Sequence, residues 1–377
     1  MGYTRSYKWP FAQRNRQVTN QPYITFVTYF RNDNYTSDFA LRVKRATGCL
    51  VSQLQRSTLE AEIILVEWNP PAERPLIIDS LDLPPSGGNV TVRAVVVDGR
   101  YHQNFLGAQE RGMHAAAAAN VGLRRARGRF VTPKASDTYV SNVTIATIAR
   151  GDLEDGAIYR CDRYDVVLPT TTLETLDDEA LLSHLEHLQG VRLSRLEHPE
   201  MWKIRDLHTN ACGDFILMSR VMWQRVRGYP FDRSVLSLDC DSLVMHAAAA
   251  LGLHEICLPA SCRIIKAVHS HLFPNRTNAV WLPWQSKLDA FFAKHDWREL
   301  QHLARTNLDY PRRRVRGIDS VIGPSVERNF VKPAQRWARG IVPGSMSPEN
   351  WGLADEPLEE RILSRAVWDT PASASAA

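Results

Sequence analysis

Hydrophobic and polar positions alternate in blocks along the first hundred residues, and these blocks predict strands and helices in turn. Residues 23–30 read YITFVTYF, a run of β-branched and aromatic residues that is typical of a strand. Apolar positions then recur at helical spacing from residue 39 to about residue 54. The runs EIILVEWNPP at 62–71 and VRAVVVD at 92–98 predict two more strands. Strand, helix and strand in this order favour a parallel pair with a right-handed crossover.

The later pattern is less regular but continues the α/β alternation. The alanine-rich run HAAAAANVGLRRAR at 114–127 predicts a helix that stops at Gly128 before the strand RFVT. The run GAIYRCDRYDVVL at 156–168 predicts one strand, and CGDFILMS at 212–219 predicts a glycine-containing strand. A further helix is expected from Asp241, where the sequence reads DSLVMHAAAALGL.

Composition divides the chain into three parts. Residues 1–20 form a polar N-terminal tail, 21–275 an α/β domain, and 276–377 a helical or irregular C-terminal extension whose last ~25 residues are expected to be disordered. Between 301 and 340, nine Lys or Arg residues stand against three acids. This basic stretch predicts a solvated or docking surface, with contact to anionic lipid at a membrane as the alternative.

Charge, hydropathy and cysteine usage limit the class of protein. A formal charge of +5 over 377 residues is too mild to imply nucleic acid, and we expect no such partner. No apolar run approaches the roughly 18 residues of a membrane span, and the N-terminus has no apolar signal-peptide stretch. The six cysteines form no CxxC pair. These features predict a soluble protein in the reducing cytoplasm.

The loops that follow the predicted strands carry the candidate chemistry. In an open parallel sheet, ligands bind beyond the carboxyl ends of the strands, so acids and hydrogen-bonding groups there carry more weight than acids elsewhere. Such groups follow four predicted strands, which is what a nucleotide site would require. They are Thr28, Tyr29, Arg31, Asn32 and Asp33 after the first strand, Glu67 near the end of the second, Asp98 after the third and Asp137 after the fourth.

The loop after the fourth strand offers only one carboxylate. The segment reads RFVTPKASDTYVS at 129–141, and Asp137 is its single acid. Taken alone, an Asp between Ser and Thr at a strand end is most simply a helix N-cap or an Asx turn.

Five segments, in order and spacing, resemble the nucleotide-sugar glycosyltransferases of the GT-A fold, and bacterial proteins of the family 2 type in particular. They are YITFVTYFRND, EIILVEWNPP, NVGLRRARGRFV with its following acid, NACGDFILMSR, and LDCDSL before a helix, within residues 22–272. The resemblance implies a Rossmann-like, mostly parallel central sheet flanked by helices. It also implies transfer of a sugar, with inversion, from a nucleotide-diphospho-sugar donor to a glycan or lipid-linked acceptor, in bacterial surface polysaccharide or glycoconjugate synthesis.

The resemblance assigns metal binding to Asp137, which stands where the family has the last acid of its metal motif. A divalent Mn²⁺ or Mg²⁺ held there would stabilise the charge on the leaving diphosphate. The run AVHSH offers His269 or His271 as a further ligand, and we select His271; the alternative is a strand-end histidine satisfied by the backbone. Because Ala135 and Ser136 replace the usual first acid, the ion depends on Asp137 and a distant histidine, or is absent.

The resemblance assigns catalysis to Asp241, matching the acid that takes the proton of the acceptor hydroxyl. Asp239 is its rival, and the structural alternative is that Asp241 caps its helix. Asp214, in the CGDF segment, corresponds to an acid at the acceptor pocket, with a β-turn as the alternative.

The remaining assignments concern the donor. Thr28, Tyr29, Asp33 and Glu67 are expected to bind the nucleoside, since a carboxylate can accept hydrogen bonds from uracil N3 or from ribose hydroxyls. Asn120 and Arg125, or Arg124 in its place, correspond to positions that face the diphosphate, where arginine would add charge-assisted hydrogen bonds. The alternative for these residues is a solvated helical face.

Two other functions compete with glycosyl transfer. A sugar-phosphate nucleotidyltransferase also uses a doubly wound sheet, but it usually has a glycine-rich basic loop after its first strand, and TYFRNDNY contains no glycine. A degenerate, non-catalytic module that binds glycan or scaffolds an assembly is the third hypothesis, and the single acid at residues 136–138 favours it.

Overall fold

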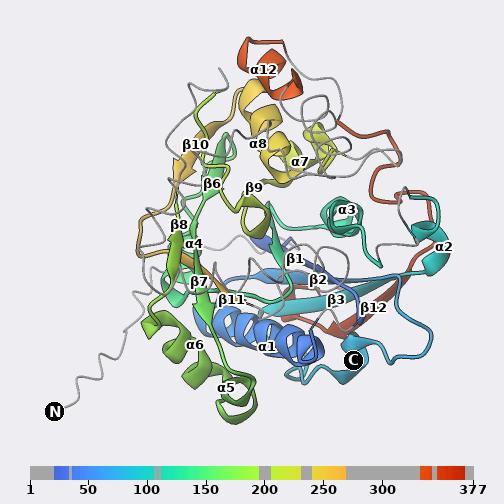
Figure 1. Cartoon of the computed structure of the whole chain (residues 1–377), viewed down its shortest axis with the longest axis vertical. Helices are drawn as coiled ribbons and strands as arrows, with labels where there is room; N and C mark the ends of the chain where they lie inside the picture. The colour runs from blue at the N-terminus through green and yellow to red at the C-terminus, as the bar shows by residue number, and fades with distance from the viewer. Residues whose placement is uncertain are drawn as a thin grey trace, which may run out of the picture.

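The computed structural model describes residues 21–33, 36–105, 108, 112–194, 205–230, 240–268, 332–341 and 346–369. Within these residues the chain is a mixed α/β structure, with helices on both faces of a central, mainly parallel sheet (Figure 1). The predicted fold class is confirmed. The proposed tail at 1–20, the domain boundary at 275 and most of the basic segment 301–340 lie outside the described residues.

The central sheet has six strands in the order β12-β3-β2-β1-β4-β9. The inner strands are mutually parallel, whereas the edge strands β12 and β9 run antiparallel to their neighbours. From β1 the chain adds β2 and β3 on one side and β4 on the other, so the strand order reverses between β1 and β4. The strands are β1 (Ile24–Phe30), β2 (Ala61–Trp68), β3 (Val90–Val97), β4 (Phe130–Ala135), β9 (Met218–Ser219) and β12 (Glu359–Ser364).

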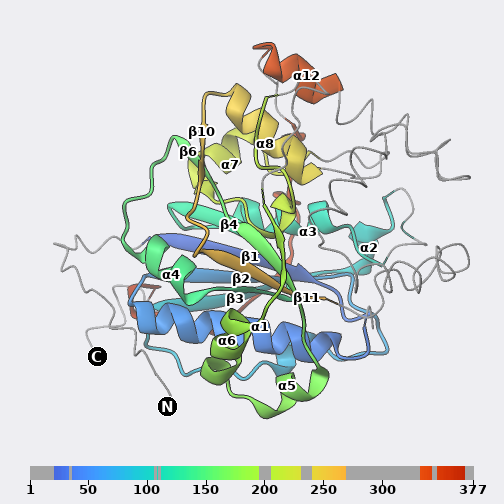
Figure 2. The same ribbon diagram turned by 60° about the vertical axis from the view of Figure 1, so that its left-hand side comes forward.

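Both faces of the inner strands are buried, and these strands are mostly apolar. On β1, Phe26 and Phe30 pack into the cluster that contains Leu50 of helix α1 (Phe39–Ser57). Val27 points to the other face and packs with helix α3 (Ala115–Arg125). Figures 1 and 2 show α1 on one side of the sheet and α3, with α7 and α8, on the other. Parallel sheets covered in this way need residues that are hydrophobic on both faces.

Helix α3 lies close to β1 because a glycine faces the strand. A Cβ atom placed on Gly122 would lie 2.3 Å from Cγ1 of Val27. The preceding alanines of α3 are also small and buried. The alanine-rich composition that predicts the helix therefore also permits its close packing on the sheet.

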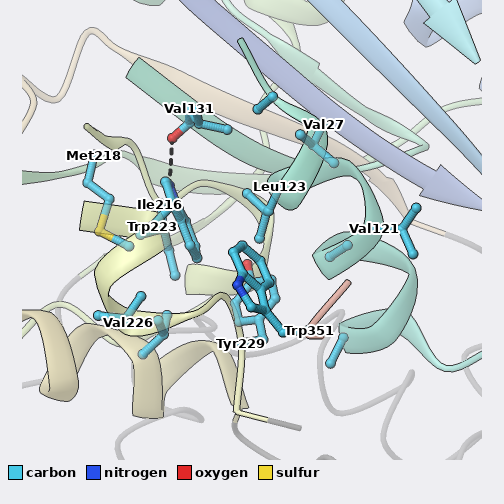
Figure 3. Packing of buried hydrophobic residues seen from close by; sticks show 14 of the residues in the cluster. Val27, Val121, Leu123, Val131, Ile216, Met218, Trp223, Val226, Tyr229 and Trp351 are labelled. Atoms are coloured by element: carbon cyan, nitrogen blue, oxygen red, sulfur yellow. Dashed lines mark hydrogen bonds between the residues drawn. The ribbon is translucent and has the colours of Figure 1, made fainter. Parts of the chain in front are cut away.

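Helices α7 (Arg220–Val226) and α8 (Cys240–Ala250) share a hydrophobic cluster with α3. Figure 3 shows Trp223 of α7 within this cluster, with its indole Nε1 donating a hydrogen bond to the Val131 carbonyl on β4 at 3.0 Å. Tyr229 and Trp351 pack in the same cluster. The cluster thereby fixes α8, which carries Asp241 in its first turn, relative to β4.

A second sheet has the order β5-β11-β7-β8. Its strand β11 runs antiparallel to β5 and parallel to β7, and β5 follows β4 after a two-residue break at Ser136 and Asp137. A separate parallel pair joins β10 to β6. These strands are β5 (Thr138–Val140), β6 (Ala157–Arg160), β7 (Asp162–Val167), β8 (Val191–Leu193), β10 (His254–Cys257) and β11 (Arg263–Val268).

The remaining described helices are short and lie mostly around the rims of the two sheets. The helix α12 packs against α8 and is the described part of the basic stretch. The α-helices are α2 (Gly99–His102), α4 (Asn142–Ala149), α5 (Thr170–Thr175), α6 (Asp178–His187) and α12 (Lys332–Ala338), and the 3-10 helices are η1 (Ile77–Ser80), η3 (Cys212–Asp214) and η5 (Val367–Asp369).

Three sequence predictions differ from the structure. The single strand expected at 156–168 is divided into β6 and β7, which belong to different sheets. The strand expected at 212–219 begins as the 3-10 helix η3 and only its end pairs, as β9. The tail expected to be disordered contains β12, an edge strand of the central sheet, because Glu360 bonds to Arg93 and Arg125 there.

Among the helices that the structure describes, none combines the length and the apolar character needed to cross a bilayer.

Candidate functional site

The reversal of strand order between β1 and β4 defines the place where a ligand is expected. In an open α/β sheet, the crevice at such a switch point lies outside the carboxyl ends of the two strands. Here β1 ends in Thr28, Tyr29 and Phe30, and Tyr29 is paired in register with Ala135 at the end of β4. Asp137 follows two residues later. The structure thus brings Tyr29 and Asp137 to the same edge.

Three carboxylates from separate segments act on the Tyr29 phenol through their charges. Burial raises the pKa of Tyr29 far above its ordinary value, and the negative charges of Asp214, Asp241 and Asp137 raise it further. The phenol therefore stays protonated and can donate a hydrogen bond. Asp137 comes from the break after β4, Asp214 from η3 and Asp241 from the start of α8, so the fold brings together three acids that are far apart in the sequence.

Asp241 is positioned against the glycine that precedes Asp214. A Cβ atom on Gly213 would lie 2.8 Å from Oδ2 of Asp241, so only glycine leaves room for this carboxylate. Oδ1 of Asp241 accepts a hydrogen bond from the backbone N–H of Ser242 at 2.9 Å. The carboxylate is half-buried and held from two sides. Its rival Asp239 lies outside the described residues.

Asp214 is part of a buried ion cluster with β7. Its Oδ2 lies 2.6 Å from Nη1 of Arg163, and Nε of Arg163 lies 2.7 Å from Oδ1 of Asp165. Asp214 is almost fully buried. Desolvation works to lower the pKa of Arg163, but the charges of Asp214 and Asp165 raise it, and the guanidinium remains charged.

The loop that leads to η3 is held by another arginine, Arg160 at the end of β6. Its guanidinium is fully buried and donates hydrogen bonds to the backbone carbonyls of His208, Asn210 and Cys212. Three carbonyls on one guanidinium fix the path of the chain into Gly213. Sequence reasoning missed Arg160, although an arginine within the otherwise apolar run AIYR was a signal.

Asp137 caps no helix, because the N-cap of α4 is Ser141, whose hydroxyl accepts a hydrogen bond from the Thr144 N–H. Instead, Oδ1 of Asp137 lies 3.6 Å from Nζ of Lys266 on β11. The Asp137 carboxylate is nearly buried. The N-cap alternative for this residue is therefore ruled out, and an ion pair takes its place.

The turn that carries Asp137 is fixed by Lys134. The Lys134 Nζ donates hydrogen bonds to the carbonyls of Ala135 and Thr138, both at 2.9 Å. Burial lowers the pKa of Lys134 to about 8. The ammonium closes the turn from inside, so the position of Asp137 depends on a lysine that the sequence pattern did not single out.

The described residues do not fit the divalent-metal centre expected at Asp137. Positions 135 and 136 are Ala and Ser, and the Asp137 carboxylate is paired with an ammonium group. Across the described residues, no three His, Cys, Asp or Glu side chains are grouped so as to hold a metal ion. The proposed ligand His271 and its rival His269 lie outside the described residues.

The Glu67 carboxylate is hydrogen-bonded within the fold. Its side chain is fully buried, and its two carboxylate oxygens accept hydrogen bonds from the backbone N–H groups of Ile77 and Ile78 at 2.9 and 3.2 Å. It thereby anchors the start of η1 to the end of β2. This corrects the expectation that Glu67 binds the nucleoside, because neither oxygen is turned toward a ligand.

The side chains of Asn120 and Arg125 are also hydrogen-bonded within the fold. The buried Asn120 amide bonds to both the carbonyl and the N–H of Tyr229. Arg125 lies at the last turn of α3, next to the amino end of β4, and bonds to Glu360 and to the carbonyls of Gly352 and Leu353. Asn120 holds the turn after α7 and Arg125 holds the C-terminal segment, so their side chains are bonded within the fold, which corrects their assignment to the donor.

The loop after β1 is joined to its neighbours through Arg31. The Arg31 guanidinium bonds to the Asn69 carbonyl at 2.6 Å and pairs with Asp33 at 3.2 Å. Asn69 follows β2, and its side-chain amide donates to the Gly112 carbonyl just before α3. Asp33 therefore lies where the loops after β1 and β2 and the loop before α3 meet. Asp98 instead caps the short helix α2.

No family model matches the chain, and no curated protein matches it. Among solved structures it is similar to S. aureus TarS, with 14% identity and a TM-score of 0.41 over 65% of this chain and 36% of that chain. For residues 1–349 of TarS in complex with UDP the values are 15% identity and a TM-score of 0.42, and for the complex with UDP-GlcNAc 13% and 0.38.

The chain spans 60% of those TarS 1–349 structures and about a third of the longer one. Because the TM-scores lie below 0.5, the function of this chain has to be argued from its own residues.

Proposed function

We propose that this protein is a glycosyltransferase that moves a sugar from a nucleotide-diphospho-sugar to a hydroxyl group of a glycan or lipid-linked acceptor. The observation that carries the proposal is that three separate segments bring acids close to the end of β1: Asp137 follows β4, and the contact of Gly213 with Asp241 places Asp241 beside Asp214, with all three charges acting on Tyr29. This convergence occurs at the carboxyl ends of β1 and β4, where the strand order reverses and where nucleotides bind in open α/β sheets.

The donor would lie along the ends of β1 and β4. Tyr29 and Asp33 provide a hydroxyl and a carboxylate beside β1, suited to a nucleoside with its ribose hydroxyls. Thr28, which was also expected to bind the nucleoside, is buried within β1 on the face opposite to Tyr29. Asp137, held by the turn that Lys134 closes, stands beside the expected place of the diphosphate. Glu67, Asn120 and Arg125 are not part of this proposed donor site.

Asp241 would act as the general base. As the acceptor oxygen bonds to the anomeric carbon, the bond from that carbon to the diphosphate oxygen breaks, and its electron pair leaves with the nucleoside diphosphate. The acceptor proton passes to the Asp241 carboxylate. Attack on the face opposite the leaving group inverts the anomeric centre, and Asp214 would hold acceptor hydroxyls beside this base.

The cellular setting belongs to the same proposal. All six cysteines are free, and Cys49, Cys161, Cys212 and Cys262 are buried, as expected in a reducing cytoplasm. Synthesis of a bacterial surface polysaccharide or glycoconjugate would suit a nucleotide-sugar donor and a lipid-linked acceptor. The basic stretch around 301–340 would then provide peripheral contact with the membrane.

Substitution of the base tests this function. With a panel of UDP- and GDP-sugars and glycan or lipid-linked acceptors, we expect the native protein to release nucleoside diphosphate as it transfers sugar. Asp241→Asn should slow transfer at least ~100-fold while nucleotide binding persists, because the amide cannot accept the proton. Asp355→Asn, an exposed change outside the site, is the matched control and should be neutral.

Two outcomes would oppose the proposal. Near-native transfer by Asp241→Asn would remove Asp241 as the base. Binding of a nucleotide sugar by the native protein without transfer to any acceptor would instead support the non-catalytic module, which the missing first acid at Ala135 and Ser136 favours.

A further inference from the structure

Lys266 occupies the place beside Asp137 where the proposed donor site would otherwise need a metal ion. Its Nζ lies 3.6 Å from Oδ1 of Asp137, and its side chain keeps 26% of its surface exposed. We propose that the Lys266 ammonium replaces the divalent cation, so that this chain binds and releases a nucleoside diphosphate without a metal. This inference rests on the proposed function, and in it Lys266 is the residue that binds the diphosphate.

Strand pairing fixes Lys266 in this position. On β11, Lys266 is in register with Thr138 of the antiparallel β5 and with Asp165 of the parallel β7. Residues paired in this way share one face of the sheet. Lys266 therefore lies between the segment that follows Asp137 and the strand that carries the Arg163 and Asp165 pair.

The charges around Lys266 are mostly negative. Asp214, Asp137 and Asp165 act on the Lys266 ammonium, and the charge of Arg163 opposes them. The acids that could otherwise bind a metal ion here already have the Lys266 ammonium beside them. A second cation at Asp137 would have to displace or repel this ammonium, since like charges at short range oppose each other.

Lys134, the other lysine of the site, is less suited to this role. Its side chain is almost fully buried, and its Nζ already donates to two backbone carbonyls. Burial also lowers the pKa of Lys134 to about 8, whereas that of Lys266 is raised. Lys134 shapes the turn, and Lys266 is the lysine with exposed surface to meet a ligand.

The chemistry requires a positive charge when the glycosidic bond to phosphate breaks. The electron pair of that bond moves onto the departing phosphate oxygen, and an ammonium at hydrogen-bond distance stabilises the added charge. In the resting protein Asp137 holds Lys266 in place. In the bound state the diphosphate would share the ammonium with Asp137, and no change in oxidation state or extra reactant is needed.

Binding measurements separate this proposal from a metal-dependent one. Calorimetry would follow UDP and GDP binding to the full chain in excess EDTA and in excess Mn²⁺. We expect equal affinity in both conditions for the native protein. Lys266→Met should bind the nucleoside diphosphate roughly 10- to 100-fold more weakly, which corresponds to the loss of one charge-assisted hydrogen bond. Lys266→Arg should retain most of the affinity.

Two further variants test whether a loss of nucleotide affinity is specific to the charge of Lys266. Lys44→Met removes a partly exposed lysine from α1, which covers the face of the central sheet opposite to α3 and α8, and should leave affinity unchanged. If Lys266→Met does not fold, Lys266→Gln keeps a polar side chain without the charge and should show the same weakening.

The possible failures are distinguishable. Nucleoside diphosphate binding that disappears in EDTA, returns with Mn²⁺ and is unchanged in Lys266→Met or Lys266→Gln would overturn the role of Lys266 and leave the glycosyltransferase assignment standing. No binding of UDP or GDP in either condition would overturn the proposed donor class as well.

Discussion

At the scale of single residues, the site is a set of acids whose charges are partly balanced by partly exposed cations. Asp214 is paired with Arg163 and Asp137 with Lys266, whereas Asp241 is held by a backbone N–H and by contact with Gly213. The charges of Asp214 and Asp137 are therefore already paired with Arg163 and Lys266. Asp241, which has no arginine or lysine beside it among the ion pairs of the described residues, is the best placed to accept a proton.

The contact between Gly213 and Asp241 leads to a prediction. In Gly213→Ala, the new methyl group would displace the Asp241 carboxylate, which is the end of a side chain and can move. We expect a stability loss below about 1 kcal/mol but a 10- to 100-fold fall in kcat, since roughly an ångström of misplacement at a reacting group has effects of this size. Transfer kinetics and thermal melting would measure the two quantities.

The matched control for this prediction is Gly156→Ala, because a Cβ atom there meets nothing within 4 Å. Its kcat and melting temperature should both be native. A native kcat in Gly213→Ala would show that Asp241 is not held in place by this contact.

At the residue scale, the sequence pattern selects groups that follow strand ends, but it does not select groups whose surroundings depend on distant partners. Tyr29, Asp137, Asp214 and Asp241 were all selected, and the fold brings them together. Lys266 was missed because its partner Asp137 lies 129 positions away and meets it only through the pairing of β11 with β5. Glu67 was misassigned because its contact with the Ile77 and Ile78 amides depends on a turn that no local pattern specifies.

At the scale of elements, close packing of α3 on the sheet positions the residues at the end of β1. Gly122 allows this approach, since its Cβ position is 2.3 Å from Val27. For Gly122→Ala we expect a loss of about 1–3 kcal/mol in the free energy of unfolding from overpacking, which exceeds the gain of about 1 kcal/mol from helix propensity. Chemical denaturation would measure it.

The double variant Val27→Ala/Gly122→Ala provides the control. Removing the Val27 methyl groups makes room for the new Cβ, so Gly122→Ala should cost less in this background than in the native one. Equal costs in both backgrounds would contradict the contact as the cause, because residues that do not touch have additive effects.

The elements that sequence predicted well are those set by local periodicity. Strands β1, β2 and β3 and helices α1 and α3 lie within a few residues of their predicted bounds. The run at 156–168 was mispredicted as one strand because Cys161 separates β6, which pairs with β10, from β7, which pairs with β11. Which sheet a strand joins depends on distant partners, and local sequence does not specify these.

At the scale of the whole molecule, the C-terminal segment returns to the amino end of the central sheet. Asp369 pairs with Arg127 at 2.7 Å, and Glu360 pairs with Arg93 and Arg125. These contacts lie at the amino ends of the strands, near the start of β4, whereas the candidate site lies at the carboxyl ends. The tail was expected to be disordered because its arginine partners belong to distant elements, which the local sequence does not specify.

A crystal structure with UDP or GDP bound would show whether the carboxyl ends of β1 and β4 hold a nucleoside diphosphate facing Asp241. We expect the diphosphate to lie beside Asp137 with its oxygens within hydrogen-bond distance of Lys266, and Asp241 to face the open side of the terminal phosphate. A nucleotide bound elsewhere on the chain, or with its phosphates away from both Asp137 and Lys266, would rule out this placement.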